Sequence, residues 1–85
     1  MIKAYIMLTL ALGDTKRVLE EIKKLEHIDS ISVVTGHVDV VLTVSVNNIE
    51  ELYELTYEKL SNIKGITSIS THIVEKEMLA EEEKE

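Results

Sequence analysis

The chain contains no cysteine among its 85 residues. Disulfides and thiolate metal sites are therefore excluded. A domain this short buries only about 60–65% of its unfolded surface, so its own core is thin. Small domains are commonly supplemented by disulfides, a metal or a partner subunit. We therefore expect this chain to associate with a partner, at least as a homodimer.

Positive charge is also scarce. Nine Lys and Arg residues stand against sixteen Asp and Glu, which gives a formal net charge of −7. Proteins that bind nucleic acids gain most of their affinity from Lys and Arg facing phosphates, and no basic run exists here. Only two helices are predicted and neither is basic, so a helix-turn-helix is not expected. We predict no direct binding to DNA or RNA.

Long apolar runs are missing, since no segment approaches the ~20 residues that span a bilayer. The start, Met1 to Lys3 followed by apolar residues 4–12, imitates a signal peptide. The same pattern recurs inside the chain from Val40, where no signal could lie, so we interpret it as a buried strand. We expect a cytoplasmic protein that does not bind membranes.

The sequence contains an internal repeat. At an offset of 38 residues, the segment Ile-Asp-Ser-Ile-Ser at 28–32 falls on Ile-Thr-Ser-Ile-Ser at 66–70. The alternating apolar residues of 2–8 fall on those of 40–46 in the same way. Each half therefore reads as one strand–helix–strand unit.

Hydrophobic periodicity and turn residues set the expected elements. They are strands at 2–11, 30–35, 38–46 and 66–75, and helices that begin after the N-cap residues Asp14 and Asn48. Gly36-His37 is read as a tight turn and Gly65 as the residue that ends the second helix. The order βαββαβ predicts an α+β, ferredoxin-like sandwich, a four-stranded antiparallel sheet with two helices on one face. We divide the chain into a domain at 1–76 and an acidic tail at 77–85, frayed or disordered.

The sheet face away from the helices carries few charges in this prediction. Its expected members are Tyr5, Met7, Thr9, Val34, Val41, Thr43 and Ser45. Small, half-apolar side chains suit packing against a second sheet. The alternative is a bland surface without a partner.

No group suggests catalysis. The histidines His27, His37 and His72 lack the spacing of a metal site. No nucleophile motif and no phosphate-binding glycine loop is present. We expect neither an enzyme nor a cofactor.

The turn from Gly36 to Asp39 is the exception. A turn glycine lets a ligand approach the backbone, and Asp is disfavoured at the start of a strand. Asp39 either holds the turn through a hydrogen bond to the backbone or, with the turn amides, receives the charged ends of an amino acid. Both interpretations stay open at this point.

The chain resembles the effector-binding (RAM) domain of the Lrp/AsnC transcription regulators over about residues 2–76. Val34-Thr35-Gly36-His37-Val38-Asp39 matches the V-T-G-x-x-D turn of that family, and the alternation from Gly65 to Val74 matches its last strand. The resemblance implies face-to-face dimers, possible rings of dimers, and amino acids bound between dimers. It assigns Gly36, His37, Val38 and Asp39 to the turn side of the site, and Ile69 and Thr71 to the strand side.

The function expected from this resemblance is an amino-acid effector-binding and oligomerisation module without a DNA-binding domain. Such a module senses its ligand alone or associates with full-length regulators of the Lrp/AsnC type. The alternative is a structural partner that joins regulator assemblies without binding a ligand. A small ferredoxin-like enzyme or metal-tolerance protein is a third class, which the lack of paired catalytic groups disfavours.

Overall fold

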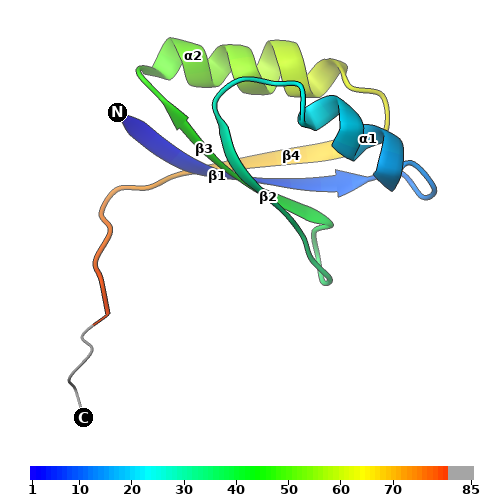
Figure 1. The fold of residues 1–85 in the computed structure, drawn as a ribbon, viewed down its shortest axis with the longest axis horizontal. Helices are drawn as coiled ribbons and strands as arrows, with labels where there is room; N and C mark the ends of the chain where they lie inside the picture. Colours follow the sequence, from blue (N-terminus) through cyan, green and yellow to red (C-terminus); the bar gives the residue numbers. More distant parts are fainter. Residues whose placement is uncertain (81–85) are drawn as a thin grey trace.

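The computed structural model describes residues 1–80, and its elements follow the order expected from the repeat (Figure 1). The strands are β1 (Ile2–Leu10), β2 (Ile28–Val33), β3 (Val40–Val46) and β4 (Ile66–Ile73). The helical segments are α1 (Thr15–Ile22) and a second run made of α2 (Ile49–Tyr53), η1 (Glu54–Lys59) and η2 (Leu60–Asn62).

The four strands form one antiparallel sheet in the order β2-β3-β1-β4. The two homologous inner strands β1 and β3 pair directly, with Ile6 opposite Leu42 and Ala4 opposite Val44. The helices lie together over one face of the sheet (Figure 1). This is the predicted α+β ferredoxin-like sandwich, and β2 and β4 are its two edges.

The core lies between the inner strands and the helices. Its buried members come from alternate positions of β1 and β3 and from the inner helix faces: Ala4, Ile6, Leu8, Val18, Ile22, Val40, Leu42, Val44, Val46, Leu52, Leu55 and Leu60. Alternation along a strand places the residues between them on the opposite face. The two halves of the repeat thus contribute to one shared core.

The predicted element boundaries are wrong by a few residues at three strands. The second strand lies at 28–33 instead of 30–35, the third begins at Val40 instead of Val38, and the fourth ends at Ile73 instead of residue 75. The chain between Val33 and Val40 is therefore a six-residue loop and not a two-residue turn. Turn residues marked the loop correctly but not its length.

The two helix starts differ. Asn48 accepts a hydrogen bond from the Glu51 N–H at 2.9 Å, and the Glu51 carboxylate accepts one from the Asn47 N–H at 2.7 Å. This confirms the expected capping arrangement, shifted by one residue for the second bond. Asp14 occupies the N-cap position of α1 without a side-chain cap bond and lies 3.5 Å from Arg17 instead.

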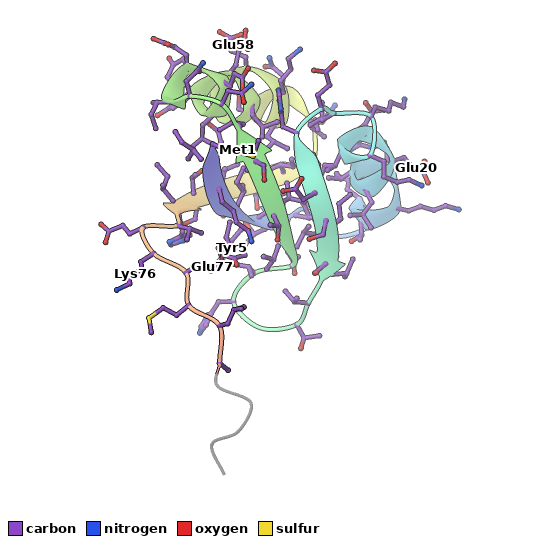
Figure 2. The ribbon with its side chains drawn as sticks, turned by 60° about the vertical axis from the view of Figure 1, so that its left-hand side comes forward. Met1, Tyr5, Glu20, Glu58, Lys76 and Glu77 are labelled. Atoms are coloured by element: carbon purple, nitrogen blue, oxygen red, sulfur yellow. The ribbon has the colours of Figure 1, made fainter. Side chains whose placement is uncertain are left out.

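After β4 the chain continues as an arm without regular secondary structure. The Val74 N–H still donates to the Lys3 carbonyl at 2.8 Å, and Lys3 Nζ lies 3.1 Å from the Glu77 carboxylate. The Glu77 carboxylate accepts a hydrogen bond from Lys3, and this bond raises the pKa of the Lys3 ammonium group. Residues 74–80 then leave the domain (Figures 1 and 2). The rest of the expected tail lies outside the described residues.

Candidate functional site

The loop from Val34 to Asp39 joins β2 to β3 and is closed at its base. The Val34 N–H donates to the Asp39 carbonyl at 2.9 Å. Gly36 has a φ of +131°, a conformation that favours glycine. His37 is exposed beside it, while Val38 is half-buried. The four residues predicted for the turn side of the site therefore do lie together.

Asp39 has a clear structural role in this loop. Its N–H donates to the Leu8 carbonyl at 2.9 Å, and its carboxylate oxygen Oδ2 accepts from the Leu10 N–H at 2.8 Å. Leu8 is the last β1 residue paired with β3, opposite Val40. Leu10 thus has no strand partner on that side, and the Asp39 carboxylate takes the partner's place. A carboxylate has about four acceptor positions, so one such bond does not exhaust it.

Ile69 and Thr71, predicted for the strand side, line a groove at the other edge of the sheet. They pair with Leu8 and Ile6 of β1, which are core residues, so they face the helix layer. The groove between β4 and the second helical run has a volume of about 440 Å³. Its lining residues are Ile49, Leu52, Tyr53, Thr56, Tyr57, Ser61, Ile69, Thr71 and Ile73. None of them is charged.

Two tyrosines that the sequence analysis did not select form the outer wall of this groove. The ring centroids of Tyr53 and Tyr57 lie 4.5 Å apart, and both side chains are more than half exposed. They stand where α2 passes into η1, a π-helical turn. Such turns are rare and often occur at functional sites. In the sequence, the two tyrosines are four residues apart, a spacing that places them on the same side of a helix, and this signal could have identified the pair.

The turn and the groove do not meet within one chain. Asp39 bonds the side of β1 that faces β3, whereas the groove lies at β4, on the other side of β1. The loop between β2 and β3 projects from the sheet on the side away from α2 (Figure 1). The six predicted site residues therefore form two separate groups in a protomer.

The sheet face without helices has its predicted members from β1 and β3, whereas Val34 lies in the loop after β2 and not in the sheet. Tyr5 pairs with Thr43 and Met7 with Val41, and all four are half-buried between the strands. On the neighbouring strand β4, the Ser70 hydroxyl lies 2.9 Å from Nε2 of His72. We call this surface the open face.

The histidines are apart from one another. His27 stands in a left-handed conformation with φ 75° after α1, His37 lies in the loop and His72 on β4. Within residues 1–80 no three His, Asp or Glu side chains are grouped so that they could hold a metal ion. No helix in the same range is long and apolar enough to cross a membrane.

The model of the Lrp/AsnC ligand binding domain matches residues 3–83 of this chain. A helix-turn-helix-type transcriptional regulator of Pyrococcus abyssi, itself uncharacterised, is 34% identical over 73 residues, which are 86% of this chain and 46% of that protein. The chain spans about half the length of the curated relatives it matches.

Two solved structures show the same fold at low sequence identity. Escherichia coli AsnC superposes with a TM-score of 0.87 and 22% identity, over 94% of this chain and 54% of that one. A transcriptional regulator of Neisseria meningitidis, solved as a complex with L-methionine, gives a TM-score of 0.84 and 17% identity, over 93% of this chain and 53% of that one.

Proposed function

Because this chain belongs to the Lrp/AsnC ligand-binding domain family, we propose that it is an amino-acid-binding and oligomerisation module and not an enzyme. Its relatives are transcriptional regulators, and we assign it a role in modulating such regulators. The domain is taken to end at about residue 76, just after the Val74–Lys3 backbone bond, with the acidic tail beyond it. Such a module works in the cytoplasm with the regulators it resembles.

The observation that carries the proposal is the separation of the two residue groups. The Gly36–Asp39 turn and the β4 groove lie on different sides of β1, so a ligand that uses both must lie between two protomers. A site completed by two chains links binding to assembly, because a ligand stabilises the oligomer that completes its pocket. The L-methionine complex of the Neisseria meningitidis protein supports an amino acid as the ligand.

The groove favours an apolar or aromatic side chain on that amino acid. Tyr53, Tyr57, Ile69 and Ile73 offer aromatic and aliphatic surface, and the lining contains no charge to pair with a charged side chain. Aromatic rings contribute beyond their buried area when a second ring stacks on them. The charged ends of the amino acid then belong at the turn of the neighbouring protomer, on its amides and on Asp39.

The dimer is assigned to the open face, by packing of one sheet on another. Met7→Asp places a charge in the middle of that face and should dissociate the dimer. Analytical ultracentrifugation at micromolar concentration tests this assignment. A wild-type chain that sediments as a monomer contradicts it.

A thermal-shift screen of the twenty amino acids tests ligand binding. An amino acid present at 100 times its Kd should stabilise the protein by about 2.7 kcal/mol. Two variants at one position separate the roles of Asp39. Asp39→Asn keeps an acceptor for the Leu10 N–H but removes the charge that an ammonium group needs, whereas Asp39→Ala removes both. Losing the charge alone should weaken binding by a factor of about 10 to 150.

If Asp39→Asn binds as tightly as wild type, the carboxylate serves only the Leu10 N–H. The second candidate function then leads: a structural partner that joins full-length regulators without a ligand. The hydrogen bond from the Leu10 N–H to the Asp39 carboxylate favours this candidate, because it gives Asp39 a structural role without a ligand. Co-purification with a full-length regulator, unchanged by amino acids, is its expected result.

A further inference from the structure

The two edges of the sheet are not equally protected. β2 has six residues, carries Asp29 at a bulge, and Asp29 accepts a hydrogen bond from the Ser45 hydroxyl at 2.5 Å. β4 has eight residues, Ile-Thr-Ser-Ile-Ser-Thr-His-Ile, without Lys, Glu, Asp or Pro. Natural proteins usually blunt an edge with charges, Pro, bulges or short length. The β4 edge has a register shift near its start and, beyond Ser68, none of the other protections.

Apolar side chains are exposed beside this unprotected edge. Ile49, Tyr53, Tyr57 and Ile73 are all about half exposed or more, and all four line the groove. An extended segment that pairs with β4 would place alternate side chains over this groove, as in recognition by strand addition. The edge and the groove therefore form one surface suited to an extended apolar peptide.

The described chain contains such a segment in its arm. Met78 is 77% exposed and Leu79 is 93% exposed, and the arm has no regular secondary structure. Adjacent large apolar residues exposed to water favour a partner surface. In sequence the next residue is Ala80, so three consecutive apolar residues are present.

The arm does not reach the groove of its own chain while Glu77 is bound to Lys3. Lys3 alternates with the core residue Ala4 and so lies on the open face, whereas the groove lies on the helix face. Met78 follows Glu77 directly, and the arm runs away from the domain (Figures 1 and 2). Its apolar residues are therefore available to a second copy.

We propose that β4 of one copy accepts residues 78–80 of a second copy as an added strand, with Met78 seated in the groove. Side chains alternate along a strand, so Met78 and Ala80 share the groove face and Leu79 points to the open face. This orientation presents only apolar side chains to an uncharged lining. Met78 would occupy the groove that the proposed function gives to the side chain of an amino-acid ligand, so the two occupants exclude each other there. A second copy is the favoured partner because the chain itself carries the exposed apolar arm, and the Lys3–Glu77 contact keeps that arm away from the groove of its own copy.

A peptide of residues 74–80 tests the proposal with a full-length, 15N-labelled acceptor that carries Met78→Asp. That acceptor keeps its groove but lacks a competent arm. We expect saturable NMR shifts of the amides of Ile69 to Ile73 and of the two groove tyrosines. A Met78→Asp peptide should bind at least about tenfold more weakly, and a Leu79→Asp peptide should stay within about threefold of the native one.

Two results overturn the proposal. One is the absence of shifts at β4 with millimolar native peptide. The other is an equal loss for both substituted peptides, because strand addition requires the two neighbours to differ. Sedimentation of full-length chains gives an independent measurement. Met78→Asp should reduce association beyond the dimer, whereas Leu12→Asp, a fully exposed position outside the arm, should not.

Discussion

β2 and β4 occupy equivalent places in the two halves of the repeat, yet their surroundings differ. On the first edge, Asp29 stands where the second has Thr67, and the first helix contributes Thr15 and Leu19 where the second contributes Tyr53 and Tyr57. Leu19 packs against the core, while both tyrosines are exposed and form the wall of a groove. We call the first half closed, because Leu19 packs against the core, and the second half open, because Tyr53 and Tyr57 line an exposed groove.

The closed and the open half should still contribute equally to the core. Ile22 and Leu60 are equivalent by the repeat, and both are fully buried. Ile22→Ala and Leu60→Ala should each lower the free energy of unfolding by about 2–5 kcal/mol through lost burial and a cavity. Urea unfolding with an unchanged m-value measures this. A cost at Leu60 less than half that at Ile22 would show that the groove side of the core is already loose.

A sharper contrast lies where each helix returns to its outer strand. Gly65 and His27 are equivalent, and both have positive φ, +108° and 75°. A Cβ at Gly65 would lie 2.9 Å from Val18 Cγ2, so Gly65→Ala should destabilise the fold by about 1–3 kcal/mol. His27→Gly removes a left-handed side-chain clash, which costs about 1–2 kcal/mol, and should stabilise by up to about 1 kcal/mol after the extra entropy of glycine. Thermal unfolding measures both variants. A lower Tm for Gly65→Ala and a higher Tm for His27→Gly confirm the prediction, and Tm shifts of the same sign contradict it.

The helix starts should differ by a smaller amount. Asn48→Ala removes the acceptor of the Glu51 N–H and should cost about 1 kcal/mol. Asp14→Ala should change stability by less than about 0.5 kcal/mol, since this side chain makes no cap bond and its contact with Arg17 is partly exposed. Urea midpoints of the two variants decide the comparison. A larger loss at Asp14 would mean that α1 depends on its first turn more than its bonds indicate.

The smallest expected effect on stability concerns the segments that follow the two outer strands. A loop closed by a backbone bond follows β2, whereas the arm that follows β4 is held by the Lys3–Glu77 contact. Lys3→Gln should free the arm without a measurable change in global stability, because the contact with Glu77 is exposed. Heteronuclear NOE values of Met78 and Leu79 should fall, whereas Lys16→Gln should leave them unchanged.

The same contact has a defined pH dependence. Since Glu77 raises the pKa of Lys3 above its ordinary value of 10.5, the contact is complete below that pH and is lost as the pH rises through the higher value in the folded state. NOE values of the arm that stay constant through this titration would show that Glu77 is not its anchor.

Much of the fold could be predicted because periodicity is a local property. Alternation in 2–10 and 40–46 and the Asn48 cap gave the element order. Gly65 has the expected positive φ but lies in the turn after the helix, whose last residue is Asn62 and whose C-cap is Ile63. The start of β3 could not be predicted, since it depends on the bonds of Asp39 to Leu8 and Leu10, which lie about thirty positions earlier in the chain. The groove was missed for a related reason. Whether Tyr57 faces the core like Leu19 or the solvent is decided by the π-helical turn, which no local pattern indicated.

The arm after β4 also determines the symmetry of any assembly it makes. Packing of two open faces is isologous, so it closes at two copies. Arm and groove are different surfaces of one chain, so two arrangements are possible: two copies that exchange arms reciprocally form a closed pair, whereas arms passed from head to tail form a heterologous contact. In the head-to-tail arrangement every copy gives one arm and receives one, and all grooves are filled only in a closed ring. A chain of copies that fails to close keeps an empty groove at one end and a free Met78 at the other, and it grows by adding copies there.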